Sequence, residues 1–211
     1  HCDQTRTMGR GGAQAAIGPL PRWSAAFVMN PNYRMFRFMT ANTDALGAYD
    51  VHYRSKDTGA PMSVEAHPCA TLIWPAREQR CGVPPHGDDR FPECATKGAC
   101  KSPLTADMAH HPAPATVAYL ATGDWFYETE MEYWTNWVVF WQNPKYREYD
   151  KGLVHQTQLR GQAWMLRTLG DAAYLLPDTS GKKRYFNEVV QNNIDYYNKT
   201  YADRADEYPL G

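Results

Sequence analysis

The sequence predicts a mainly α-helical fold of antiparallel helical hairpins, with one long irregular loop that contains cysteines. Three observations predict it. After about residue 112, apolar side chains recur at helical spacing over long segments. Short links with Gly and Pro separate these segments, so consecutive helices must fold back on one another. Between residues 68 and 105 the helical pattern is absent, while cysteine, proline and glycine accumulate.

Two short helices are predicted near the N-terminus. The first begins at Pro21 and contains an apolar run that reaches Met29. Asn30-Pro31 ends this helix, because the residue before a proline is pushed out of the α region. A second helix is expected over residues 31–45, and the two should form a hairpin. In the segment that follows, alternating polar residues indicate a short strand whose side chains point to one side: Asp50, His52 and Arg54.

The long loop contains four of the five cysteines, namely Cys69, Cys81, Cys94 and Cys100, whereas Cys2 lies near the start of the chain. Cross-links would stabilise a segment that has little core of its own, and disulfides form in oxidising compartments. The cysteines therefore favour a disulfide-stapled insertion over residues 68–105 and an extracellular or periplasmic location. Free thiols and a metal site are the alternatives.

Length and charge limit the classes of partner. The 211 residues fit one α/α domain spanning residues 1–211, or a fragment of a larger one. The formal net charge of −1 provides no long-range field that would attract nucleic acid. Membrane insertion is not expected either, because no stretch approaches the roughly 18 apolar residues that a membrane helix needs.

Helices are predicted in the second half over residues 116–121, 124–142, 157–176 and, starting at 178 or 182, up to 201. Gly123 should end the first of them and Asp124 should cap the second, because glycine favours the C′ position and aspartate the N-cap. In the helix over residues 157–176, small and aliphatic residues at helical spacing predict the stripe that faces the core: Leu159, Ala163, Leu166, Gly170 and Ala173.

The helix over residues 124–142 has the most informative pattern. One face contains polar residues, among which the three carboxylates are expected to be solvated: Asp124, Glu128, Glu132, Thr135 and Gln142. The opposite face contains Trp134, Trp137 and Trp141. Sugar rings stack on exposed tryptophans, so these residues and Trp164 are candidate sugar platforms, and ordinary core packing is the alternative.

Glu130 falls in the middle of this aromatic face. A carboxylate among tryptophans loses hydration, which favours the protonated form that a general acid needs. The alternative is an ion pair with an arginine of the next helix, Arg160 or Arg167.

Two further groups of polar residues are candidates for chemistry. His110 and His111 precede Pro112, with Asp107 just upstream, so either histidine is a candidate general base or metal ligand. Capping and packing are the alternative for this pair. Gln158 and Arg160 lie at the start of the helix over residues 157–176, where unpaired N–H groups suit a ligand that bears a carboxylate.

Two stretches, HHPAPATVAYLATGDWFYETEMEYW and RGQAWMLRTLGDAAYLLPD, resemble the helical-hairpin repeats of the (α/α)6-toroid superfamily. They are particularly similar to segments of large uncharacterised secreted bacterial proteins of that kind. In such toroids a helix pair ends in a turn like Thr122-Gly123-Asp124, and a run like Arg160 to Trp164 opens an inner helix. A complete ring needs more helices than this chain contains, so the resemblance implies an incomplete toroid.

The resemblance implies a carbohydrate-active or carbohydrate-binding protein, because toroids of this class include glycoside hydrolases and polysaccharide lyases. For hydrolysis, Glu130 is the candidate acid. For elimination from a uronate, His110 or His111 would remove the proton while Arg160 neutralises the acid. His52, Arg54 and Gln158 join the tryptophans as candidate ligand-binding residues. The expected partner is a polysaccharide or oligosaccharide, and no cofactor is predicted.

Two other interpretations follow from the same residues. The chain would be a non-enzymatic extracellular structural or assembly protein if its aromatic faces form the core or a subunit interface. Its partners would then be other copies of the chain or the rest of a larger parent chain. Alternatively, Asp107, His110 and His111 would hold zinc in a hydrolase.

Overall fold

The computed structural model describes residues 3, 4, 6, 14–72, 103–111, 113–155 and 158–203. Within this part of the chain it contains six α-helices: α1 (Arg22–Met29), α2 (Tyr33–Asp44), α4 (Thr116–Thr122), α5 (Trp125–Phe140), α6 (Leu159–Leu175) and α7 (Gly181–Tyr197). Single helical turns follow α2 at Ala45–Ala48 and α7 at Asn198–Ala202. The prediction of a mainly α fold is confirmed.

The helices begin and end where local chemistry requires it. The Asn32 side chain accepts a hydrogen bond of 3.0 Å from the Met35 N–H, so α2 starts two residues later than Pro31. Gly123 adopts the left-handed conformation with φ of 65°, which ends α4. The Asp124 carboxylate then accepts from the Phe126 N–H at 2.8 Å and caps α5.

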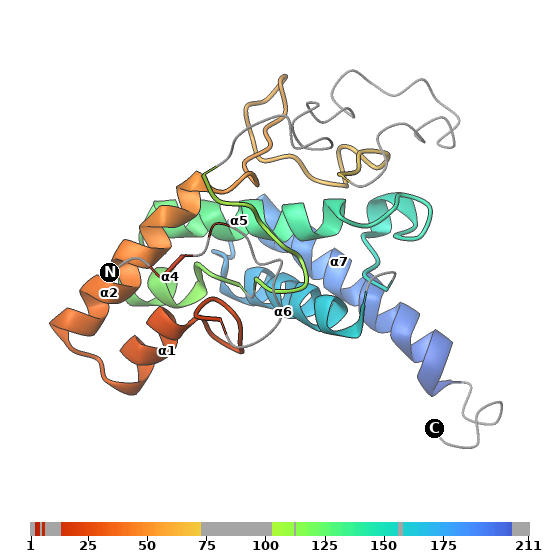
Figure 1. Cartoon of the computed structure of the whole chain (residues 1–211). Helices are drawn as coiled ribbons and strands as arrows, with labels where there is room; N and C mark the ends of the chain where they lie inside the picture. Colours follow the sequence, from red (N-terminus) through yellow and green to blue (C-terminus); the bar gives the residue numbers. More distant parts are fainter. Residues whose placement is uncertain are drawn as a thin grey trace.

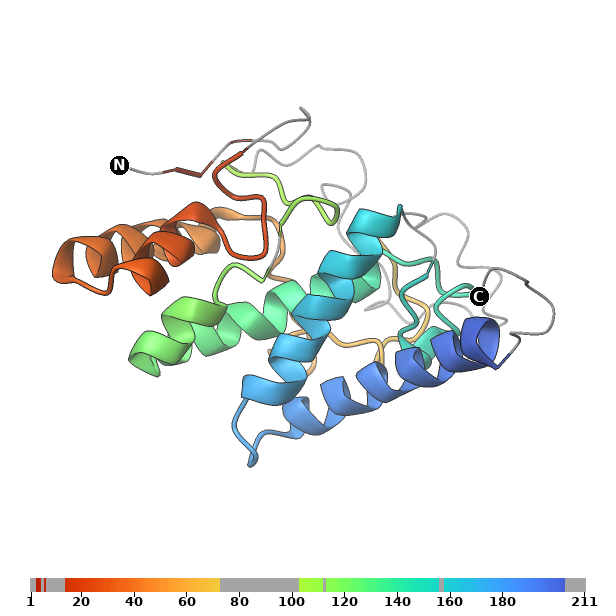
Figure 2. The same ribbon diagram turned by 90° about the horizontal axis from the view of Figure 1, so that it is seen from below.

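Helices that follow one another along the chain contact each other: α1 with α2, α4 with α5, α5 with α6, and α6 with α7. Figures 1 and 2 show α1 and α2 together at one end of the molecule and α6 and α7 toward the other, with α5 extending between them. The segment from Tyr49 to Leu72 runs along α5, and the Leu72 N–H donates to the Phe140 carbonyl at 3.0 Å.

The prediction of a short strand at Asp50, His52 and Arg54 is wrong. Only isolated bridges occur there among the described residues, one pairing Tyr49 with Leu104 and one pairing Arg54 with Pro61. The backbone turns between these bridges, so the alternation of polar residues in the sequence does not indicate a strand here.

Helix α5 is buried more completely than its sequence predicts. Every residue from Tyr133 to Phe140 is buried, so this half of the helix has no solvated face. Thr135 and Gln142, which were expected on the polar face, are both buried. Glu132 is half-buried, and its burial raises the pKa of its carboxyl, so the expected solvation of the three carboxylates is only partly correct.

The predicted core stripe of α6 is only partly correct. Ala173 is buried as predicted and Leu166 packs against the core, whereas Leu159 is 80% exposed. The other buried apolar residues lie one position away from the predicted ones, at Met165, Leu169 and Ala172. Both sets have helical spacing, so periodicity alone does not distinguish them. Contacts with α5 and α7 select the second set.

Arg147 joins the segment after α5 to the segment that covers it. The side chain is fully buried, and its guanidinium donates to the carbonyls of Gln142 at 3.0 Å, Pro68 at 2.8 Å and Tyr149 at 3.0 Å, and also to that of Ala70. A buried cation is tolerated only when its donors are satisfied. These carbonyls satisfy them and so fix residues 68–70 against residues 142–149.

Two features of the prediction lie wholly or partly outside the described residues. Cys2, Cys81, Cys94 and Cys100 are not among them, and neither is most of the predicted insertion over residues 68–105. In the part that is described, no helix combines the length and the apolar character that crossing a membrane requires.

We predict that Arg147→Met lowers the free energy of unfolding by about 3 kcal/mol, because it leaves several buried carbonyls without a donor. Urea-induced unfolding measures this change. Lys145→Met removes an exposed positive charge two residues away and should change the free energy by less than about 0.5 kcal/mol. Equal stability of the two variants would contradict the role given to Arg147.

Candidate functional site

Asp107, His110 and Arg160 come together although Arg160 lies 50 residues from His110. The Nδ1 atom of His110 lies 2.9 Å from an oxygen of Asp107, and its Nε2 atom lies 2.8 Å from Nη2 of Arg160. A carboxylate only accepts and a guanidinium only donates. The guanidinium therefore faces the lone pair of Nε2, whereas Nδ1 lies close to the Asp107 carboxylate without meeting hydrogen-bond geometry among the described residues.

A tight turn and a helix start position these three side chains. Asp107 opens the turn, because its carboxylate accepts from the Ala109 N–H at 2.8 Å and its carbonyl accepts from the His110 N–H at 3.3 Å. Arg160 is the second residue of α6 and is exposed. The His110 side chain retains 12% exposure, so the group lies at the surface.

His111 is placed differently from its neighbour. Its Nδ1 atom lies 2.9 Å from the Asp107 N–H, and its Nε2 atom lies 3.3 Å from the Tyr49 hydroxyl. Burial lowers the pKa of His111 to about 4, and its ring packs on Trp134 at 5.3 Å between centroids. The ring is thus a neutral part of the core with both nitrogens engaged. Of the two candidate bases, only His110 is accessible.

Glu130 forms a buried pair with His52. Oε1 of Glu130 lies 2.7 Å from Nε2 of His52, and the carboxylate is 3% exposed. The other ring nitrogen of His52 lies 3.0 Å from the Tyr49 carbonyl, so both nitrogens face acceptors, an arrangement that favours the protonated imidazole. The partner of Glu130 is therefore a histidine of the segment before α4, and the alternative of a pair with Arg160 or Arg167 is not realised.

Burial and Glu130 act on the titration of His52 in opposite directions. Burial alone lowers the pKa of the imidazole, but the hydrogen bond to Glu130 and the charge of its carboxylate together raise it above the usual value of 6.5. The second oxygen of Glu130 has no hydrogen-bond partner within the described part of the chain.

Tyr133 provides a surface on which two of the candidate residues rest. The His52 ring lies 4.8 Å from the Tyr133 ring, and the Arg54 guanidinium lies 4.9 Å above it. The sequence pattern did not single out Tyr133. Tyr133 could have been recognised from its position three residues after Glu130, because this spacing places both side chains on the same side of α5.

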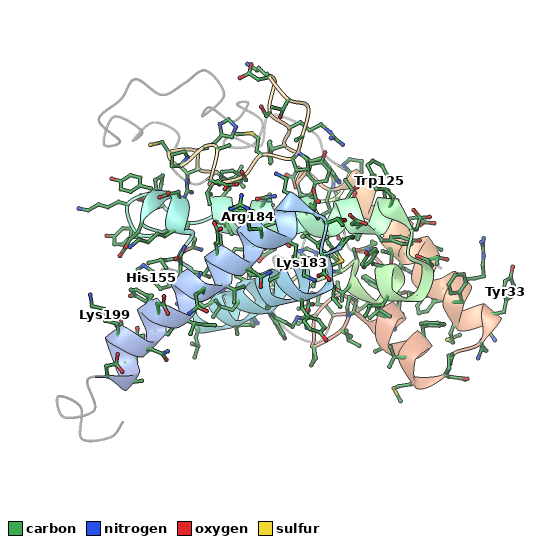
Figure 3. All side chains as sticks on the ribbon, turned by 180° about the vertical axis from the view of Figure 1, so that it is seen from behind. Tyr33, Trp125, His155, Lys183, Arg184 and Lys199 are labelled. Atoms are coloured by element: carbon green, nitrogen blue, oxygen red, sulfur yellow. The ribbon has the colours of Figure 1, made fainter. Side chains whose placement is uncertain are left out.

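The candidate tryptophans are mostly internal. Trp134 and Trp137 are buried and contact each other edge to face at 5.7 Å. Trp141 is half-buried, and Trp164 is half-buried beneath the guanidinium of Arg167. Trp125, which the pattern did not single out, is 71% exposed at the first turn of α5 (Figure 3).

The remaining candidates are Gln158 and a metal site. Gln158 is exposed just before α6, and its side chain does not cap the helix. No group of three or more side chains of His, Cys, Asp or Glu is arranged to hold a metal ion among the described residues. Asp107, His110 and His111 are all described, and the two imidazoles face different partners, which gives the zinc interpretation no support.

Comparisons of this chain with protein-family models, with curated proteins and with solved structures found no match. The residues and their geometry are therefore the basis for any proposal on function.

We predict that Glu130→Gln lowers the pKa of His52 from above 6.5 to that value or below it, because burial then acts without the carboxylate. NMR titration of the imidazole measures the shift. In the wild type, this pair stabilises the fold fully below pH 6.5 and loses its contribution as the pH rises through the raised pKa.

Glu188→Gln, which removes an exposed carboxylate from α7, is the control and should leave the titration of His52 unchanged. A His52 pKa that is identical in Glu130→Gln and in the wild type would show that the two groups do not form an ion pair.

Proposed function

We propose that this chain is a carbohydrate-active, incomplete α/α-toroid segment of a secreted protein, and that it acts on glycans containing uronic acids. The observation that supports this proposal is the contact of His110 with both Asp107 and Arg160. Elimination from a uronate needs a base for one proton and a cation for the carboxylate. His110 and Arg160 supply these two groups at adjacent atoms.

The proposed reaction is β-elimination. The Asp107 carboxylate lies 2.9 Å from Nδ1 of His110 and favours the positive charge that develops on the imidazole, so the lone pair of Nε2 can remove the proton next to the uronate carboxylate once Arg160 turns to that carboxylate. The electron pair of the broken C–H bond forms the C4–C5 double bond. The C4–O bond then breaks, and the departing oxygen takes a proton from water.

Arg160 contributes charge and geometry to this step. Its planar guanidinium binds a carboxylate through two parallel hydrogen bonds, which neutralises the acid group and makes the neighbouring proton easier to remove. Arg160 lies in the first turn of α6, and the N-terminus of a helix favours an anion.

Hydrolysis with Glu130 as the acid has less support. Glycoside hydrolysis uses two carboxyl groups about 5 to 10 Å apart on either side of an accessible sugar. Glu130 is buried, and its described hydrogen bond is to His52. Its role in the proposal is to hold the segment that carries His52 against α5.

Two observations support the toroid and the secreted location as parts of the proposal. Consecutive helices contact each other, as hairpins of a toroid do. Cys69 is disulfide-bonded, which fits a stapled insertion over residues 68–105 and an oxidising compartment.

A structural or assembly role is the second candidate, and the burial of Trp134 and Trp137 favours it. The structural interpretation expects the aromatic faces to form either the core or a subunit interface, and these two rings lie in the core. A structural role predicts no reaction at His110.

We predict that the full-length parent protein releases unsaturated products from a polyuronate, and that His110→Ala lowers the rate by about 100-fold or more. Ultraviolet absorbance of the new double bond measures the rate. Arg160→Lys should retain part of the activity, because it keeps the charge and loses the two-point contact.

His155→Ala is the matched control, since His155 contacts the Tyr146 carbonyl and stacks on Tyr196 rather than on the site. Full activity of His110→Ala, or the absence of unsaturated product from every polyuronate tested, would refute the elimination.

A further inference from the structure

A groove of about 740 Å³ lies along α2, apart from the residues of the candidate site. It is lined by Asp3, Arg22, Arg34, Met35, Arg37, Phe38 and Ala41. This volume is in the range of roughly 300 to 1,000 Å³ that is typical of ligand sites. Three of the seven lining residues are arginines, and one is acidic.

The charges of the groove are not balanced. Nε of Arg22 donates to the Asp3 carboxylate at 2.7 Å, so these two charges neutralise each other. The side chains of Arg34 and Arg37 form no hydrogen bond or ion pair within the described part of the chain, and both residues are exposed. The groove thus carries two uncompensated positive charges, although the whole chain has a formal net charge of −1.

The spacing of the two free arginines matches two-point binding of an oxyanion. They lie three residues apart on α2, so their side chains are neighbours on one side of the helix. Like charges at this spacing repel each other, and a bound anion would relieve the repulsion. The guanidinium fork matches carboxylate and sulfate groups, which accept two parallel hydrogen bonds.

The other lining residues of the groove are apolar, and one wall is fixed. Met35, Phe38 and Ala41 supply this apolar surface, which we call the floor of the groove. Asp3 forms this wall and is held in place, because its N–H donates to the Asn42 side chain and the neighbouring Gln4 amide donates to the Asn42 carbonyl at 2.9 Å. A small inorganic ion would leave this floor uncovered, whereas a sugar ring can cover it with its C–H groups.

We propose that this groove binds a carboxylate- or sulfate-bearing oligosaccharide and so anchors an acidic glycan away from the reacting residues. The choice of a saccharide as ligand rests on the proposed function. The positive charge and the volume of the groove do not depend on it. Arg34 and Arg37 hold the acid groups, and Phe38 supports the ring between them.

The test is calorimetric titration of the full-length protein with an oligouronate, a neutral oligosaccharide of equal length and inorganic sulfate. His110→Ala is the background in all variants, so that no turnover occurs during the titration. We expect the double variant Arg34→Gln/Arg37→Gln to weaken binding of the oligouronate by about tenfold or more, because two charge-assisted contacts are lost. Binding of the oligouronate should also weaken as salt is added.

The matched control removes two positive charges elsewhere, as Arg184→Gln/Lys199→Gln. Figure 3 shows Arg184 and Lys199 on α7 and its extension, far from Tyr33 at the start of α2. This variant should bind the oligouronate within about twofold of its parent, since surface charges more than about 10 Å away are screened.

Equal affinity of both double variants for the oligouronate would overturn the inference. So would equal binding of the neutral oligosaccharide, or inorganic sulfate binding as tightly as the oligouronate. Failure of the proposed function is distinguishable, because it would abolish product formation and leave the loss of binding in Arg34→Gln/Arg37→Gln intact.

Discussion

The burial of α5, which is continuous from Tyr133 to Phe140, is the constraint on which the rest of the structure depends. A helix that is largely buried must bury polar side chains too, and each buried polar group costs free energy unless it has a partner. The Thr135 hydroxyl therefore donates to the Met131 carbonyl at 2.6 Å, and the Asn136 amide donates to the Glu132 carbonyl at 3.0 Å. The Glu130 carboxylate cannot accept a hydrogen bond from a carbonyl of its own helix, and it pairs instead with His52 of a distant segment.

The same constraint positions the segments that cover α5. His52 binds Glu130 while its other nitrogen donates to Tyr49, and Tyr49 contacts both Trp134 and His111. One buried carboxylate thus helps to order the segment that follows α2 and the turn that contains the histidines. Arg147 performs the same task at the other end of the helix through carbonyls.

Features set by neighbouring residues could be predicted from the sequence, whereas features set by distant contacts could not. Asn30-Pro31 and Gly123-Asp124 fix helix ends through the backbone of adjacent residues, and these ends were correctly predicted. The core stripe of α6 depends on which side faces α5 and α7, and the sequence allowed two sets with the same spacing. His110 and Arg160 were each recognisable as candidates, but their contact depends on where the turn meets α6. Tyr133 and the groove along α2 went unrecognised because their meaning comes from what lies opposite them.

Under the proposed function, the contact between Arg160 and His110 would also determine which ligands can engage the imidazole. The guanidinium donates to Nε2 of His110, so the lone pair that would accept a proton is occupied. A neutral sugar offers Arg160 nothing stronger than this bond. A carboxylate competes for the guanidinium, and once it binds, the imidazole is unmasked beside the group that the proposed reaction requires. The protein would then distinguish acidic from neutral glycans before any reaction occurs, because only an acidic glycan makes Arg160 exchange His110 for a carboxylate.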